Sequence, residues 1–148
     1  MDNVVIIQIV AGILALAVFG VWIAYVAFLS GILRKCHPQS RTMEPGMVWL
    51  LLIPVVSIVW NFFVITALAK SLGNEFRLRN VPTGDYEPGK SVGIGMAVCG
   101  ACSIVPFVNF VAIPAHLILW IIYWVKIAGF SKTLDSIPGI APATAYGD

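Results

Sequence analysis

Three long stretches of this chain carry no charged side chain. No Asp, Glu, Lys or Arg occurs from 4 to 33, from 47 to 69 or from 91 to 125. A helix needs about 20 apolar residues to cross the roughly 30 Å of hydrocarbon in a bilayer, whereas the helices of a soluble domain need charged faces. The charge distribution therefore predicts an integral membrane protein.

The composition favours one compact membrane domain. Of 148 residues, 59% are hydrophobic and 11% are charged, which leaves little material for a separate soluble domain. The first residues, Met1, Asp2 and Asn3, lack the basic segment of a cleavable signal peptide, and the apolar run after them is longer than a signal peptide uses. We therefore expect the first helix to stay in the membrane.

We predict an all-α fold, a polytopic membrane helical bundle with four transmembrane helices arranged as two hairpins. The predicted helices cover about 4–33, 47–72, 91–106 and 111–131. Together they form a single domain over 1–137. Pro106 and Asn109 mark the turn of the second hairpin, because both residue types favour turns. The segment 138–148 is predicted to be a flexible tail, since it is rich in Pro, Gly and small residues.

Pro54 lies inside the second predicted helix. Its ring removes a backbone donor, so it either kinks the helix or begins a half-helix that turns back within the membrane. With four full crossings, Arg34, Lys35 and Arg41 lie on one side and the other six basic residues on the opposite side. The positive-inside rule then places both termini in the cytoplasm. A half-helix at Pro54 instead puts all nine basic residues on one side and the N-terminus on the other.

Small residues form a stripe along the first helix. They recur at alternating steps of three and four, which places them on one helix face. These residues are Ala17, Gly20, Ala24, Ala27 and Gly31. In lipid, helices associate where small residues let the two backbones approach closely. We call these five residues the small-residue stripe and predict that it packs against another helix.

Few side chains within the apolar stretches can carry chemistry. Asn61, together with Pro54 and Pro114, is predicted either to bond across helices or to line a polar cavity. His116 is a candidate cofactor ligand, and the alternative is a hydrogen bond to a backbone carbonyl.

Cys99 and Cys102 have the C-x-x-C spacing of a redox pair, although small neighbours on the same helix also fit simple packing. No metal site is predicted, because Cys36 and His37 have no further pair of ligands at suitable spacing. Near the end of the second helix, Glu75 lies close to two arginines, and we expect a solvated helix end there.

Two segments resemble a class of known proteins. One runs from 43 to 76 and contains MEPG, IP, Trp60 and SLGNEF, and the other is IIYWVKIA at 121–128. They are similar to small bacterial multi-helix membrane proteins of uncharacterised families. The resemblance implies a bacterial inner membrane and a four-helix arrangement, and it implies no activity or catalytic residue.

The leading hypothesis is a non-enzymatic membrane protein that packs against a larger membrane complex as an accessory or assembly subunit. The chain has no G-x-S-x-G, H-E-x-x-H or phosphate-binding glycine loop. Expected partners are other membrane proteins, in a hetero- or homo-oligomer, and membrane lipids. No nucleic acid and no cofactor are expected. The alternatives are a small carrier or lipid-binding protein, and a redox or cofactor protein that uses Cys99, Cys102 or His116.

Overall fold

The computed structural model describes residues 3–137, and every regular element in that range is a helix. The prediction of an all-α fold is confirmed for this part of the chain. Three helices are long and apolar enough to cross a membrane, namely Asn3–Lys35, Val55–Leu78 and Asn109–Ser136. The flexible tail predicted for 138–148 lies outside the described residues.

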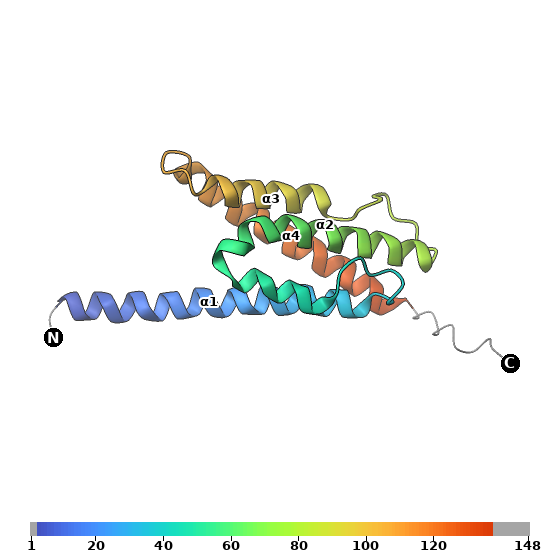
Figure 1. Cartoon of the computed structure of the whole chain (residues 1–148), viewed down its shortest axis with the longest axis horizontal. Helices are drawn as coiled ribbons and strands as arrows, with labels where there is room; N and C mark the ends of the chain where they lie inside the picture. Colours follow the sequence, from blue (N-terminus) through green and yellow to red (C-terminus); the bar gives the residue numbers. More distant parts are fainter. Residues whose placement is uncertain (1–2, 138–148) are drawn as a thin grey trace.

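The longest helix, α1, spans Asn3–Lys35 without interruption. It ends at two basic residues, shortly before Pro38, which cannot continue a helix. The other elements pack along its C-terminal half, and its N-terminal half projects past them (Figure 1). Only the C-terminal half therefore contributes to the bundle core.

The region predicted as one helix over 47–72 is divided into two elements. A 3₁₀ helix, η1, covers Pro45–Leu52, and the α-helix α2 covers Pro54–Leu78. Ile53 between them is extended, with φ −86° and ψ 111°, because the ring of a following proline disfavours the helical region. The chain reverses direction at this point, so η1 returns along α1 before α2 sets out again (Figure 1).

Side chains from the neighbouring helices donate to three of the backbone carbonyls of η1. Trp22 Nε1 donates to Leu51 O at 3.3 Å, Trp60 Nε1 to Met47 O at 2.8 Å, and Ser30 Oγ to Pro45 O at 2.9 Å. A backbone polar group within hydrocarbon must find a partner in the protein. These three donors help a 3₁₀ run of unusual length to persist.

The remaining helices form a hairpin. The α3 helix covers Lys90–Cys102, the α4 helix covers Asn109–Ser136 and contains Pro114, and a turn over 103–108 joins them. The two helices lie side by side (Figure 1). At 1.5 Å per residue, the 13 residues of α3 extend roughly 20 Å, which is less than the hydrocarbon thickness.

The core lies where α1, η1, α2, α3 and α4 meet. Its largest fully buried side chains include Tyr25, Leu29, Ile65, Leu68, Phe76, Met96, Tyr123 and Ile127. A close approach of three helices at Gly93 leaves no room for a side chain there. A Cβ on that glycine would lie 2.5 Å from Ile65 Cγ2 and 2.8 Å from Tyr123 Cε2.

All nine basic residues lie in the half of the bundle that is remote from the N-terminus of α1. They lie at and just after the end of α1, in the C-terminal half of α2 and just after it, in the C-terminal half of α4, and at the start of α3 (Figure 1). Lys35 Nζ lies 2.7 Å from Asp135 Oδ2, and Lys126 Nζ lies 3.9 Å from Asp85 Oδ2. The N-terminus of α1 lies at the opposite end (Figure 1).

Candidate functional site

The small-residue stripe lies on the outer face of α1. Its first four residues are exposed, and Gly31 is half-buried. A Cβ added at Gly20 or at Gly31 would meet no atom within 4 Å. Within the described chain, α1 instead packs inward through larger side chains such as Tyr25 and Leu29. The stripe is thus open to whatever surrounds the molecule.

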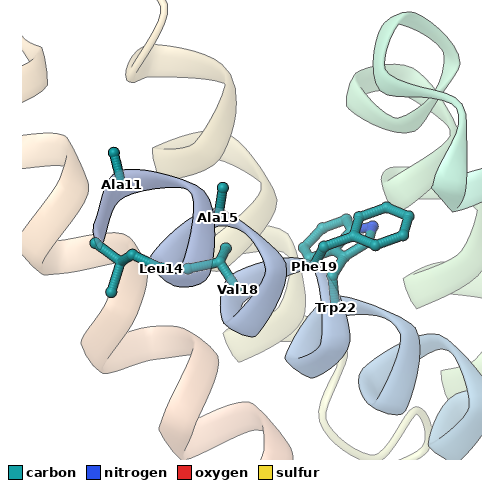
Figure 2. A pocket seen from close by; sticks show the side chains of 6 residues that line it. All are labelled: Ala11, Leu14, Ala15, Val18, Phe19 and Trp22. Carbon is teal, nitrogen blue, oxygen red and sulfur yellow. The ribbon is translucent and has the colours of Figure 1, made fainter. Parts of the chain in front are cut away.

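The N-terminal half of α1 has no covering helix in the described chain. Every residue from 3 to 21 is exposed, and the most apolar 18-residue window of the helix is 0% buried. A hollow of about 490 Å³ along this half is lined by α1 alone, with Leu14 and Phe19 among its walls (Figure 2). Since one helix supplies every wall, the hollow is an open surface.

A second hollow, of about 360 Å³, separates α1 from α4. Its walls are four residues of α1 and three of α4, and they are apolar except for the ring nitrogens of Trp22, His116 and Trp120. We call it the α1–α4 groove. Large rings hold the two helices apart just beside it, since the ring centroid of Tyr25 lies 5.5 Å from that of Trp120 in a tilted arrangement and 5.8 Å from that of Trp124 in an edge-to-face arrangement.

His116 bonds to a backbone carbonyl as one of its two sequence interpretations predicted. Its Nδ1 lies 2.9 Å from Met96 O on α3. Gly100 allows this approach, because a Cβ there would lie 3.2 Å from Cε1 and Nδ1 of the ring. The imidazole therefore links α3 to α4 and also lines the α1–α4 groove.

The residues of the predicted polar cavity come from α2 and α4. Asn61 is half-buried on α2, and its Oδ1 is buried without a hydrogen-bond partner among the described residues. Pro54 begins α2, and Pro114 is exposed within α4. Neither Asn61 nor Pro114 lines the α1–α4 groove.

The three thiols are separate from this groove. Cys99 and Cys102 are free and half-buried on α3. Cys36 is buried just after α1, and burial, with a smaller contribution from nearby Glu75, raises the pKa of its thiol to about 12. Among residues 3–137, no group of three or more His, Cys, Asp or Glu side chains is placed to hold a metal ion.

A buried ion pair replaces the solvated helix end expected near Glu75. The Glu75 side chain is 1% exposed and that of Arg79 9%. Glu75 Oε1 accepts from Arg79 Nε at 2.8 Å, and Oε2 accepts from the backbone N–H of His37 at 2.7 Å. Arg79 Nη1 also donates to Leu134 O at 3.0 Å. The pair thus joins the loop after α1, the end of α2 and the end of α4.

Neither the aromatic cluster of Tyr25, Trp120 and Trp124 nor this ion pair was predicted from the sequence. The sequence carried a weak signal for the cluster, because Trp120 and Trp124 are four residues apart on one face of α4. The sequence carried an equally weak signal for the ion pair, because Glu75 and Arg79 have the same spacing at the end of α2. Spacing alone does not report burial, so neither signal was decisive.

Comparisons with protein-family models, curated proteins and solved structures give no match to this chain.

Proposed function

We propose that this chain is a non-enzymatic integral membrane protein that packs against other membrane proteins, as an accessory or assembly subunit. The observation that carries the proposal is the outer face of α1. The small-residue stripe has open space at Gly20 and Gly31, and no described helix covers the N-terminal half of α1.

The length of α1 adds support. Its 33 residues extend about 50 Å at 1.5 Å per residue, well beyond the roughly 30 Å of hydrocarbon. Lipid chains can cover an exposed apolar helix, but close approach of a second backbone requires small residues along a common face. The stripe supplies that face outside the bundle, where it contributes nothing to this chain's own core.

The test adds bulk to the stripe and to a matched position. Ala24→Leu and Gly20→Leu should remove proteins that co-purify with the wild type from native membranes in gentle detergent. Ala15→Leu is the control, because Ala15 is also exposed on α1 but lies off the stripe. Wild-type protein that purifies as a lone monomer would overturn the proposal, and so would equal co-purification with all three variants.

We also infer a membrane and an orientation. The resemblance in 43–76 and 121–128 supports a bacterial inner membrane. Of the two topologies, the location of all nine basic residues in one half of the bundle supports the one with a half-helix at Pro54. That half then lies toward the cytoplasm, and Asn3 faces the opposite side. Four full crossings with both termini in the cytoplasm is the competing topology.

Cysteine accessibility separates the two topologies. In a chain without its three native cysteines, Asn3→Cys and Thr83→Cys are labelled from each side with a membrane-impermeant maleimide. The favoured topology predicts labelling from opposite sides. Labelling of both positions from the same side would support the four-crossing topology instead.

A further inference from the structure

One exposed face of α2 changes from apolar to cationic along its length. Val59, Phe63, Lys70 and Arg77 follow one another at steps of four or seven residues, which places them on a single helix face. Val59 is 61% exposed and Phe63 59%, and both cations are exposed as well. We call these four residues the α2 outer face. It is open to the surroundings of the molecule over its whole length.

The change from apolar to cationic lies at the membrane boundary. Lys70 is the first charged residue after the charge-free stretch 47–69. Val59 precedes it on α2 by about 16 Å at 1.5 Å per residue, which is close to half of the roughly 30 Å of hydrocarbon in a bilayer. The apolar part of the face therefore has the length of the acyl chains of one leaflet, and Lys70 lies at the level of the lipid headgroups.

The two cations of the α2 outer face are not neutralised within the described chain. The basic residues that form ion pairs there are Lys35, Arg79, Lys90 and Lys126. Arg77 instead has neutral neighbours, since its Nη2 donates to Asn74 Oδ1 at 3.2 Å and its guanidinium carbon lies 5.7 Å from the ring centre of Tyr86. Lys70 and Arg77 thus present two positive charges to the headgroup layer.

A phospholipid with a net negative charge complements both parts of this face. Basic side chains at the membrane surface attract anionic headgroups, and the apolar part of the face matches an acyl chain. We propose that the α2 outer face binds one anionic phospholipid, with its phosphate at Lys70, its headgroup toward Arg77 and an acyl chain along Phe63 and Val59.

This site is independent of the small-residue stripe, because all four residues belong to α2 and a lone molecule of the protein contains them. It is also independent of the choice between the two topologies, since Lys70 ends the same apolar stretch in both.

The experiment compares two lipids that have the same acyl chains and differ in headgroup charge. The full-length protein in detergent is titrated with palmitoyl-oleoyl phosphatidylglycerol or with palmitoyl-oleoyl phosphatidylcholine, and binding is read by native mass spectrometry. The anionic lipid should bind about fivefold more tightly for each cation that its headgroup engages. Equal affinity for the two lipids would overturn the proposal.

Variants locate the site. Lys70→Gln should weaken binding of phosphatidylglycerol by about fivefold, whereas Lys70→Arg should retain it, because the charge is kept. Lys132→Gln is the matched control, since Lys132 is also exposed and without an ion pair in the described chain but lies on α4. It should leave the affinity unchanged. Equal losses in Lys70→Gln and Lys132→Gln would overturn the proposal, because the lipid would then respond only to the overall charge of the protein.

Inorganic phosphate tests whether the acyl chain is part of the recognition. An equal concentration of inorganic phosphate should not displace phosphatidylglycerol, because it makes no contact with Phe63 and Val59. Displacement by phosphate would overturn the proposal, since the cations would then hold a free anion rather than a lipid.

Discussion

Arg79 holds Glu75 in a buried ion pair at the point where three segments of the chain converge. Arg79 Nη2 lies 2.8 Å from Glu75 Oε1, and Arg79 follows directly after α2, four residues beyond Glu75. Because Glu75 also receives the His37 amide and Arg79 also reaches the end of α4, the pair acts as a joint between distant segments.

Removal of either partner should destabilise the protein. Glu75→Leu or Arg79→Leu leaves an uncompensated charge, and we expect each to lower the free energy of unfolding by about 3–5 kcal/mol. The double variant should lose much less than the sum of the two, because no charge is then left unpaired. Unfolding in mixed detergent and denaturant, followed by circular dichroism, measures all three variants.

The exposed pair between Lys35 and Asp135 is the control for that prediction. Its side chains are 41% and 57% exposed, so Lys35→Ala should cost only about 0–1 kcal/mol. A cost for Glu75→Leu no larger than this would contradict the proposed role of the buried pair.

Gly93 should not tolerate a methyl group. The close contacts of its virtual Cβ with Ile65 and Tyr123 predict that Gly93→Ala costs about 1–3 kcal/mol through overpacking. Gly129→Ala in α4 is the matched control, because its Cβ would meet nothing within 4 Å. Removing a glycine from that helix interior should be neutral or stabilise by about 0.5–1 kcal/mol. Thermal unfolding of both variants tests the difference.

Trp60 should stabilise the 3₁₀ helix through its ring nitrogen. Trp60→Phe keeps an aromatic ring but leaves Met47 O without its donor, and we expect a loss of about 1–3 kcal/mol. Faster hydrogen exchange in η1 should accompany that loss. Trp49→Phe, on the exposed side of η1, provides the comparison. Equal exchange in the two variants would show that the bond to Met47 does not hold the segment.

Cys36 should resist alkylation in the folded protein. Because its pKa is raised to about 12, almost no thiolate, the reactive form, exists at pH 8. Mass spectrometry after iodoacetamide treatment should find Cys36 unmodified in the folded state and modified in denaturing detergent. Rapid labelling of folded protein at pH 8 would contradict the burial of this thiol.

The same shift predicts a pH dependence of stability. The folded-state pKa lies above the ordinary thiol value of 9.0, so the stabilising contribution is complete below about pH 9 and is lost as the pH rises toward 12. Wild-type protein should therefore lose stability more steeply over this range than Cys36→Ala does.

The all-α fold and its long apolar helices could be predicted from sequence, because charge content and hydropathy are local properties. The ends of the helices were less predictable. The helix predicted over 91–106 ends at Cys102, and the one predicted over 111–131 extends over Asn109–Ser136. Ile53 broke the second predicted helix, and its position before a proline was a local signal that pointed to either a kink or a reversal.

The candidate sites also could be predicted only in part from the sequence. The alternating spacing of three and four residues places the small-residue stripe on one face of α1. The spacing does not say whether that face points toward the bundle or away from it. His116 was recognisable as a polar group at depth, whereas its bond to Met96 and its place in the α1–α4 groove depend on how α3 and α1 pack beside α4.

The sequence by itself determined that this chain is helical and has helices able to cross a membrane, since hydrocarbon demands apolar side chains and internal backbone bonds. The tertiary structure decided which faces of those helices pack against one another and which stay exposed. It turned the chain back at Ile53, buried Glu75 with Arg79 and left the small-residue stripe exposed. The physical reason is that burial and pairing depend on contacts between residues distant in sequence, which local patterns do not record.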